Sequence, residues 1–270
     1  MAKKSSHLWL KIVVGIVIVL VLLAGAAELG VRWMVSKQLK DDFAQQAGAV
    51  TAEEPTISFG SYPVLLGALQ KDIHHVDLTT PNTLQITYPG GPDSVPEVTG
   101  MPKAHITIDG LKLDDPNRPI ASTLNVDTTV SDEFILAQAQ RAMDESTSGS
   151  ENTQPQSLED LAGMLLKKVV KITDVTSNPA EGTLGIEFTG GAANLAVKPV
   201  VSDGEVSFEA AGASLFGIDM PQEVIDALTN GLKDSAGGMA GSMQVTNFRV
   251  VDGGLDVSMV GHDVDLQNMK

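Results

Sequence analysis

The chain has 270 residues, enough for one large or two modest domains, and 43% of them are hydrophobic but only 4% aromatic. Its net charge of −16 at pH 7 arises after position 40, because residues 1–40 hold six basic side chains and one acidic side chain. An acidic domain repels nucleic-acid phosphates, so we expect no nucleic-acid partner. The lack of cysteine excludes disulfides, thiolate catalysis, Cys-ligated zinc and a lipid-modified cysteine anchor.

The N-terminal segment 8–27 reads LWLKIVVGIVIVLVLLAGAA and is interrupted only by Lys11. A twenty-residue helix spans about 30 Å, the thickness of the bilayer hydrocarbon core, so we predict that residues 1–28 form a cytoplasmic N-terminus and a transmembrane anchor. Basic residues precede the apolar run, which places the rest of the chain on the extracytoplasmic (periplasmic) side of the cell membrane. The alternative is a cleaved signal peptide, because Ala24-Gly25-Ala26 has the small-x-small form of a cleavage site. Both interpretations predict export.

After the apolar segment, residues 29–47 contain no proline and repeat an apolar side chain every four positions, at Val31, Val35, Leu39 and Phe43. This spacing predicts an amphipathic helical stalk. The remaining residues, 48–270, are predicted to form one extracytoplasmic domain.

Strand patterns dominate this domain. Period-two alternation of apolar residues is typical of antiparallel sheets with one dry face, and it occurs at Ile106 and Ile108, at Leu184, Ile186 and Phe188, at Leu195 and Val197, at Val206 and Phe208, and at Leu255, Val257 and Met259. Asp203-Gly204 and Asp252-Gly253-Gly254 lie between such patterns and predict two hairpin turns, since these residues tolerate positive φ.

Three further helices are predicted from capping residues and apolar spacing. Ser131 caps a run that ends at Met143, a second helix follows Ser157, and Pro221 opens a third. The polar stretch 144–157 between the first two has few apolar residues and is predicted to be a mobile loop.

Two segments resemble a known family. Residues 54–78, EPTISFGSYPVLLGALQKDIHHVDL, are similar to the opening signature of LmeA-like phospholipid-binding proteins, which are exported actinobacterial envelope proteins. Gly60 and Pro63 match the pattern, although Val64 replaces the usual aromatic residue. Residues 245–266 resemble the family's closing strand, glycine turn and last strand.

The resemblance implies an α+β fold: an N-terminal transmembrane helix followed by a curved antiparallel sheet wrapped around helices, as in tubular lipid-binding domains. It also implies phospholipid binding in support of lipomannan or lipoarabinomannan synthesis. Apolar inner residues of such a sheet would leave a groove for acyl chains. The alternative is that the same residues close into an ordinary core, because alternation indicates burial but not a cavity.

Six residues are candidate lipid contacts. Three leucines within the opening signature would line a lipid entrance, or else form a helical core turn. The densest basic group in the acidic domain would meet an anionic phospholipid headgroup, or else form a solvated helix end. The candidates are Leu65, Leu66, Leu69, Lys167, Lys168 and Lys171.

Candidate catalytic and metal-binding patterns are weak. His74-His75 has Asp72 and Asp77 nearby, but alternation in a strand splits these four side chains between two faces, so neither face collects three ligands. Asp263 and Asp265 resemble an Asp-x-Asp metal clamp, yet a final strand with alternating polarity explains the spacing. We therefore predict no catalytic residue, no metal site, no cofactor and no enzymatic activity.

The sequence favours a membrane-anchored, extracytoplasmic phospholipid-binding protein whose partners are the cytoplasmic membrane and an anionic phospholipid. The alternative is an adapter or regulator that binds no lipid and contacts a membrane glycosyltransferase.

Overall fold

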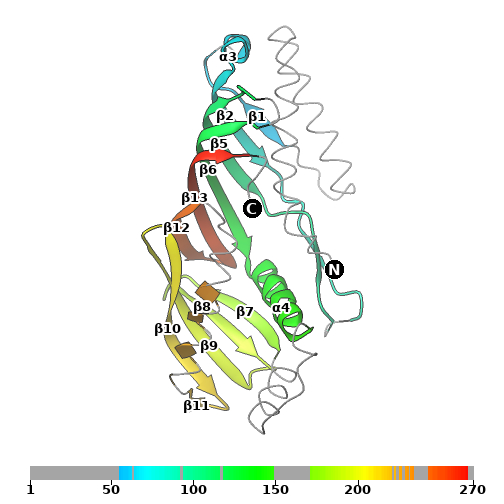
Figure 1. Cartoon of the computed structure of the whole chain (residues 1–270). Helices are drawn as coiled ribbons and strands as arrows, with labels where there is room; N and C mark the ends of the chain where they lie inside the picture. The colour runs from blue at the N-terminus through cyan, green and yellow to red at the C-terminus, as the bar shows by residue number, and fades with distance from the viewer. Residues whose placement is uncertain are drawn as a thin grey trace.

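The computed structural model describes residues 55–62, 64–91, 94–115, 118–148, 171–220, 222, 225–226, 229–230, 232–233 and 243–266, apart from the side chains at 65, 68 and 146–148. These residues form an elongated molecule in which two large antiparallel sheets follow one another along the long axis (Figure 1). A third, two-stranded sheet pairs β3 (Gln85–Thr87) with β4 (Glu97–Thr99).

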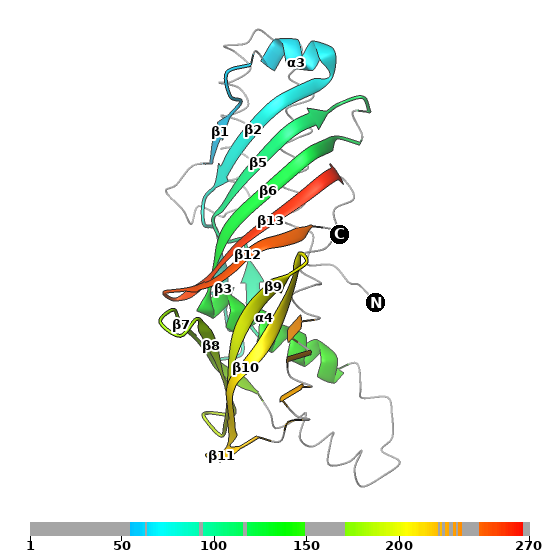
Figure 2. The same cartoon turned by 90° about the vertical axis from the view of Figure 1, so that its left-hand side faces the viewer.

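The larger sheet has six strands in the order β1-β2-β5-β6-β13-β12, all antiparallel neighbours, which Figure 2 shows from the side. Two of its strands, β6 and β13, have twelve residues each and span about 40 Å at ~3.3 Å per residue. The bounds are β1 Thr56–Ser58, β2 Asp72–Thr80, β5 Ala104–Lys112, β6 Ile120–Ser131, β12 Gln244–Val251 and β13 Gly254–Asp265.

The smaller sheet has five strands in the order β11-β10-β9-β8-β7. Its strands follow one another along the chain and are joined by short turns, so it is a meander. The bounds are β7 Ile172–Asn178, β8 Thr183–Phe188, β9 Ala193–Ser202, β10 Glu205–Leu215 and β11 Ile218–Asp219.

Two continuous helices lie in the described part of the chain. The short helix α3 (Val64–Gln70) precedes β2 at one end of the molecule, and α4 (Asp132–Ser148) follows β6 near the smaller sheet. The Ser131 hydroxyl accepts a hydrogen bond from the backbone N–H of Phe134 at 3.3 Å and so caps α4, as predicted. The described positions between 222 and 233 are also helical.

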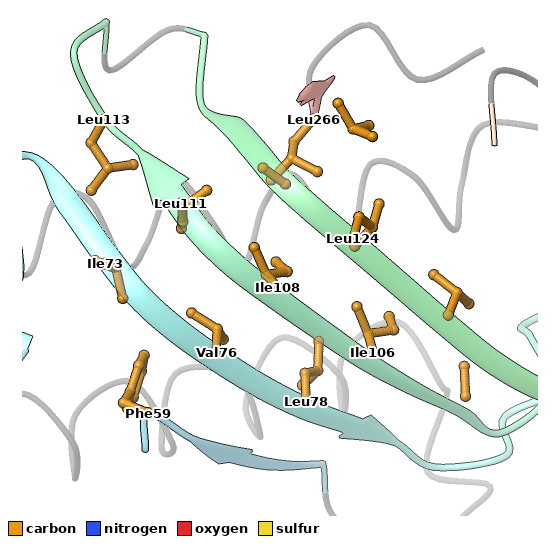
Figure 3. Close-up of a cluster of buried hydrophobic side chains, with 14 of the residues drawn as sticks. Phe59, Ile73, Val76, Leu78, Ile106, Ile108, Leu111, Leu113, Leu124 and Leu266 are labelled. Carbon is orange, nitrogen blue, oxygen red and sulfur yellow. The ribbon is translucent and has the colours of Figure 1, made fainter. Parts of the chain in front are cut away.

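The core follows the alternation of the strands. On β2, β5 and β6 the inward side chains form one packed cluster, in which Ile106 and Leu111 have no exposed surface (Figure 3). A second cluster joins the two large sheets, since Val175 and Leu184 of the smaller sheet pack with Leu255 and Val257 of β13. Burying a side chain of this size stabilises the fold by about 1.5–3 kcal/mol.

The predicted strands and hairpins are confirmed. The alternating segments form β5, β8, β9, β10 and β13. Asp203-Gly204 joins β9 to β10 with φ angles of 54° and 81°, and Gly253, with φ of 71°, lies in the turn between β12 and β13. Helix α4 extends five residues beyond its predicted end, so residues 144–148 of the predicted loop are helical.

The predicted α+β fold, with a transmembrane helix followed by one sheet wrapped around helices, is wrong. The described residues are mostly β-strand, and they form two large sheets with α4 against their junction. Alternation marks which face of a strand is buried, but it does not specify whether a helix or a second sheet covers that face. Within the described ranges no helix is both long and apolar enough to cross a membrane. The predicted span 8–27, the stalk 29–47 and the helix after Ser157 lie outside these ranges.

Candidate functional site

The described residues enclose an apolar cavity of about 500 Å3 at the junction of the two large sheets and α4. This volume falls within the ~300–1,000 Å3 typical of small-molecule sites. Strands β6, β7, β8, β9, β10, β12 and β13 all contribute side chains to its wall, as does α4. The cavity is therefore assembled from segments that lie far apart along the chain.

One face of the larger sheet serves two purposes. On β6, Leu124 and Val126 belong to the packed cluster, whereas Thr128 and Val130, two and four residues further on the same face, line the cavity. On β13, Val264 belongs to the packed cluster and Leu255, Val257 and Met259 line the cavity. On β6 the alternation continues without interruption from the core into the cavity, whereas on β13 the two consecutive exposed residues His262 and Asp263 shift it by one position before Val264. The cavity therefore extends the core along these two strands.

Small side chains on α4 leave part of this space open. The helix presents Ile135, Gln138, Ala139 and Ala142 to the cavity, at the spacing of one helical face. Two of these four are alanines, whose methyl groups reach only a short distance from the helix. Larger aliphatic residues at these positions would fill much of the space.

Helix α4 is held against the smaller sheet by polar contacts from its first residue and from its middle. The Asp132 carboxylate accepts hydrogen bonds from the backbone N–H and the hydroxyl of Ser177 on β7, at 3.0 and 2.5 Å. Eight residues later, the Gln140 side-chain amide donates to the carbonyl of Ile172 at 2.8 Å. Because both ends of β7 are bonded to α4, the helix is fixed as one wall of the cavity.

The described lining of the cavity contains no titratable side chain. Its polar members are Thr128 and Gln138, and the Thr128 hydroxyl already donates to the carbonyl of Lys103 at 2.8 Å. A ligand would therefore gain its binding free energy from burial of apolar surface, about 0.8 kcal/mol per methylene. Such a site suits a hydrocarbon chain, whose polar end stays outside.

A second, shallower groove of about 430 Å3 adjoins the cavity along β10. Its lining includes the run Ala210-Ala211-Gly212-Ala213 and the polar residues Glu209, Asp226 and Thr229. Phe208 lines both the groove and the cavity and packs edge-on against Phe248 of β12, with ring centroids 6.1 Å apart. Phe208 therefore separates an apolar chamber from a groove with polar groups.

None of the six predicted lipid contacts belongs to the described lining of the cavity. Leu66 and Leu69 lie on α3, 49% and 85% exposed, at the opposite end of the molecule from the smaller sheet (Figure 1). Lys171 is exposed immediately before β7. The side chain of Leu65, and Lys167 and Lys168 altogether, lie outside the described residues. The six assignments therefore stay predictions.

The signal in the sequence is weak for the residues that do line the cavity. Alternating strands identified Leu184, Val197 and Val257 as buried, which is equally true of packed core residues. The alanines on the inner face of α4 mark the open space, but alanine is also an ordinary helix former.

Two of the histidine and aspartate candidates, His75 and Asp77 on β2, form cross-strand pairs with residues of β5. His75 Nδ1 lies 2.7 Å from Asp109, and His105 Nε2 lies 2.8 Å from Asp77. His74 instead stacks on Tyr62, with ring centroids 3.9 Å apart. Among the described residues, no group of three His, Asp or Glu side chains is placed to hold a metal ion.

The two aspartates of the last strand form ion pairs with basic side chains of the protein. Asp265 accepts a hydrogen bond from Arg118 at 2.7 Å, which raises the pKa of the guanidinium, and Asp263 lies 3.8 Å from Lys112. These contacts favour a structural role for both carboxylates.

Comparison with known proteins identifies one family. The model of the LmeA-like phospholipid-binding family matches residues 26–259, most of the chain. Neither a curated protein nor a solved structure matches the chain.

Proposed function

The chain belongs to the LmeA-like phospholipid-binding family, and on this premise we propose that its apolar cavity holds acyl chains of a phospholipid. The single observation that supports this assignment is the composition of the lining. Of the twenty described residues that line the cavity, two, Thr128 and Gln138, have polar side chains and the other eighteen are apolar. A water-soluble ligand would find almost no hydrogen-bond partner there, whereas a hydrocarbon chain needs none.

The proposed function is binding without catalysis. The described part of the cavity wall offers no acid, base or charged group to act on a bound ester, and a hydrolase or transferase needs such groups beside the reacting atoms. The protein would carry, sense or present a lipid molecule at the membrane.

Membrane attachment is a separate proposal that rests on the sequence of residues 8–27. A tether at the outer face of the cytoplasmic membrane would keep the domain within reach of its lipid. We further propose that it supports synthesis of lipomannan, lipoarabinomannan or another envelope glycolipid, with a membrane glycosyltransferase as partner. The preference for an anionic headgroup rests on Lys167, Lys168 and Lys171, of which Lys171 is exposed.

A photoactivatable phospholipid tests the cavity directly. The full chain is reconstituted into vesicles that contain a phospholipid with a diazirine in one acyl chain, and cross-linked peptides are mapped by mass spectrometry. We expect labels on α4 and on strands β12 and β13, at residues that line the cavity. Labels confined to the N-terminal apolar segment and the exposed surface would contradict the proposal and favour the adapter.

A further inference from the structure

The turn between β10 and β11 carries an exposed apolar tip, which comprises residues 215–218. Leu215, Phe216 and Ile218 are 42%, 77% and 72% exposed, and they account for three of the six exposed large hydrophobic residues of the described chain. Exposure of three such side chains within four residues is unfavourable in water, so it calls for an explanation.

The backbone holds Phe216 in this exposed position. Its φ angle is +52°, a conformation that is unfavourable for a bulky residue, and Gly217 follows at +75°. The backbone N–H of Phe216 donates to the carbonyl of Ala192 at 2.7 Å, which fixes the tip against the turn between β8 and β9. An aromatic residue thus occupies a position where asparagine or glycine would fit with less strain.

The tip and the turn beside it contain no charged side chain of their own. Residues 215–218 read LFGI, and the adjoining turn, 189–192, reads TGGA. Carboxylates flank the tip, because exposed Asp219 follows Ile218 and the Glu187 carboxylate lies beside Gly191, so docking at this end would depend on insertion of the apolar side chains and not on attraction to anionic headgroups. No charged side chain in either turn has to be removed from water when the end of the sheet enters a bilayer interface.

The tip is continuous with the route to the cavity. It lies at the end of β10, the strand whose residues 208–213 line the groove and whose Phe208 reaches the cavity. Figure 2 shows β10 running from this end of the molecule toward the junction of the two sheets. A lipid that left a bilayer beside the tip would meet the groove first and the cavity next.

We propose that residues 215–218 dock the protein on a lipid bilayer, with Phe216 and Ile218 inserted among the headgroups, so that a phospholipid enters along β10 and past Phe208. This inference rests on the proposed function. A bilayer is favoured over a protein partner because a stable protein interface buries about 800 Å2 on each side, more than three side chains at a hairpin tip provide. A few inserted apolar side chains are sufficient at a membrane interface.

The absence of cysteine allows a site-specific test on the full chain. Ile218→Cys is labelled with a polarity-sensitive fluorophore, and the protein is reconstituted into phosphatidylcholine–phosphatidylglycerol vesicles that contain a lipid spin-labelled in its acyl chain. Asp203→Cys at the other end of β10 and Leu69→Cys on α3 are the matched controls. We expect a blue shift and quenching at position 218 and at neither control. A fluorophore at position 218 that stays in water, or one at position 69 that is quenched instead, overturns the docking assignment.

A double variant tests the consequence for lipid entry. Phe216→Asn tolerates the positive φ, and Ile218→Thr keeps a β-branched residue, so the fold is preserved while most of the apolar surface is removed. We expect the rate of phospholipid transfer between vesicles to fall about tenfold or more, given the free energy of burying two such side chains. Photo-cross-linking in the cavity at equilibrium should not change. An unchanged transfer rate overturns the entry route.

The two proposals fail in different ways. If phospholipid cross-links to residues of the cavity but the fluorophore at position 218 stays in water, lipid binding holds and docking is refuted. A quenched label at 218 without any cavity cross-link supports docking and refutes the lipid cavity.

Discussion

Replacement of Ala139 by leucine distinguishes an open cavity from a packed core. Ala139 lies on the cavity face of α4, so the three added carbons would enter empty apolar space. At about 0.8 kcal/mol per buried methylene, full burial would add at most ~2.4 kcal/mol to the free energy of unfolding, and we expect about 1–2 kcal/mol because Ala139 is partly exposed. The same change should reduce photo-cross-linking of phospholipid in the cavity.

Ala137→Leu is the matched control. Ala137 lies two residues away on the same helix, has no exposed surface and does not line the cavity, so the same carbons would overpack the core and cost about 1–3 kcal/mol. Urea titration with pulse proteolysis of both reconstituted full-length variants measures the difference in the free energy of unfolding. If Ala139→Leu destabilises the protein as much as Ala137→Leu and leaves lipid labelling unchanged, the space beside α4 is not a binding cavity.

Two further predictions concern the framework around the cavity, and thermal unfolding checks both. Gly254→Ala should destabilise the protein by about 2 kcal/mol or more, because the new Cβ would lie 2.1 Å from the carbonyl oxygen of Val130. The control Gly212→Ala places its Cβ where no atom lies within 4 Å and should change the free energy of unfolding by less than about 0.5 kcal/mol. Equal effects of the two substitutions would contradict the close packing of β13 on β6. Asp132→Ala should lower the free energy of unfolding by about 1–3 kcal/mol, because it leaves the part-buried backbone N–H of Ser177 without its hydrogen-bond acceptor. Unaltered stability would show that this hydrogen bond does not hold α4 on β7.

The molecular shape explains why two ends of the protein have different roles in these experiments. Helix α3 and the β10–β11 tip lie at opposite ends of the long axis, and both expose large apolar side chains. Only the tip adjoins strands that line the cavity. A label at each end therefore reports which end faces the membrane.

The sequence alone determined most of the strands and turns. Apolar alternation is a local property of an extended chain, so it identifies Ile106, Leu184 and Val257 as buried without any information on how the strands pair. Positive φ is also a local requirement, which is why the turns at Asp203 and Gly253 were predicted. The Ser131 cap depends on neighbouring residues and was predicted for the same reason.

The tertiary structure decided how these elements assemble. Two sheets rather than one, and a cavity rather than a filled core, depend on distances between side chains of segments as far apart as Ala139 and Val257. Burial of an apolar residue has the same sequence pattern whether its neighbour is another side chain or a bound acyl chain. The exposed tip at Phe216 likewise appears only when the strands are placed, because an apolar residue in an alternating segment is expected to be buried. Local patterns reflect the conformational preferences of the backbone, whereas cavities and exposed tips depend on which surfaces remain uncovered after the chain has packed.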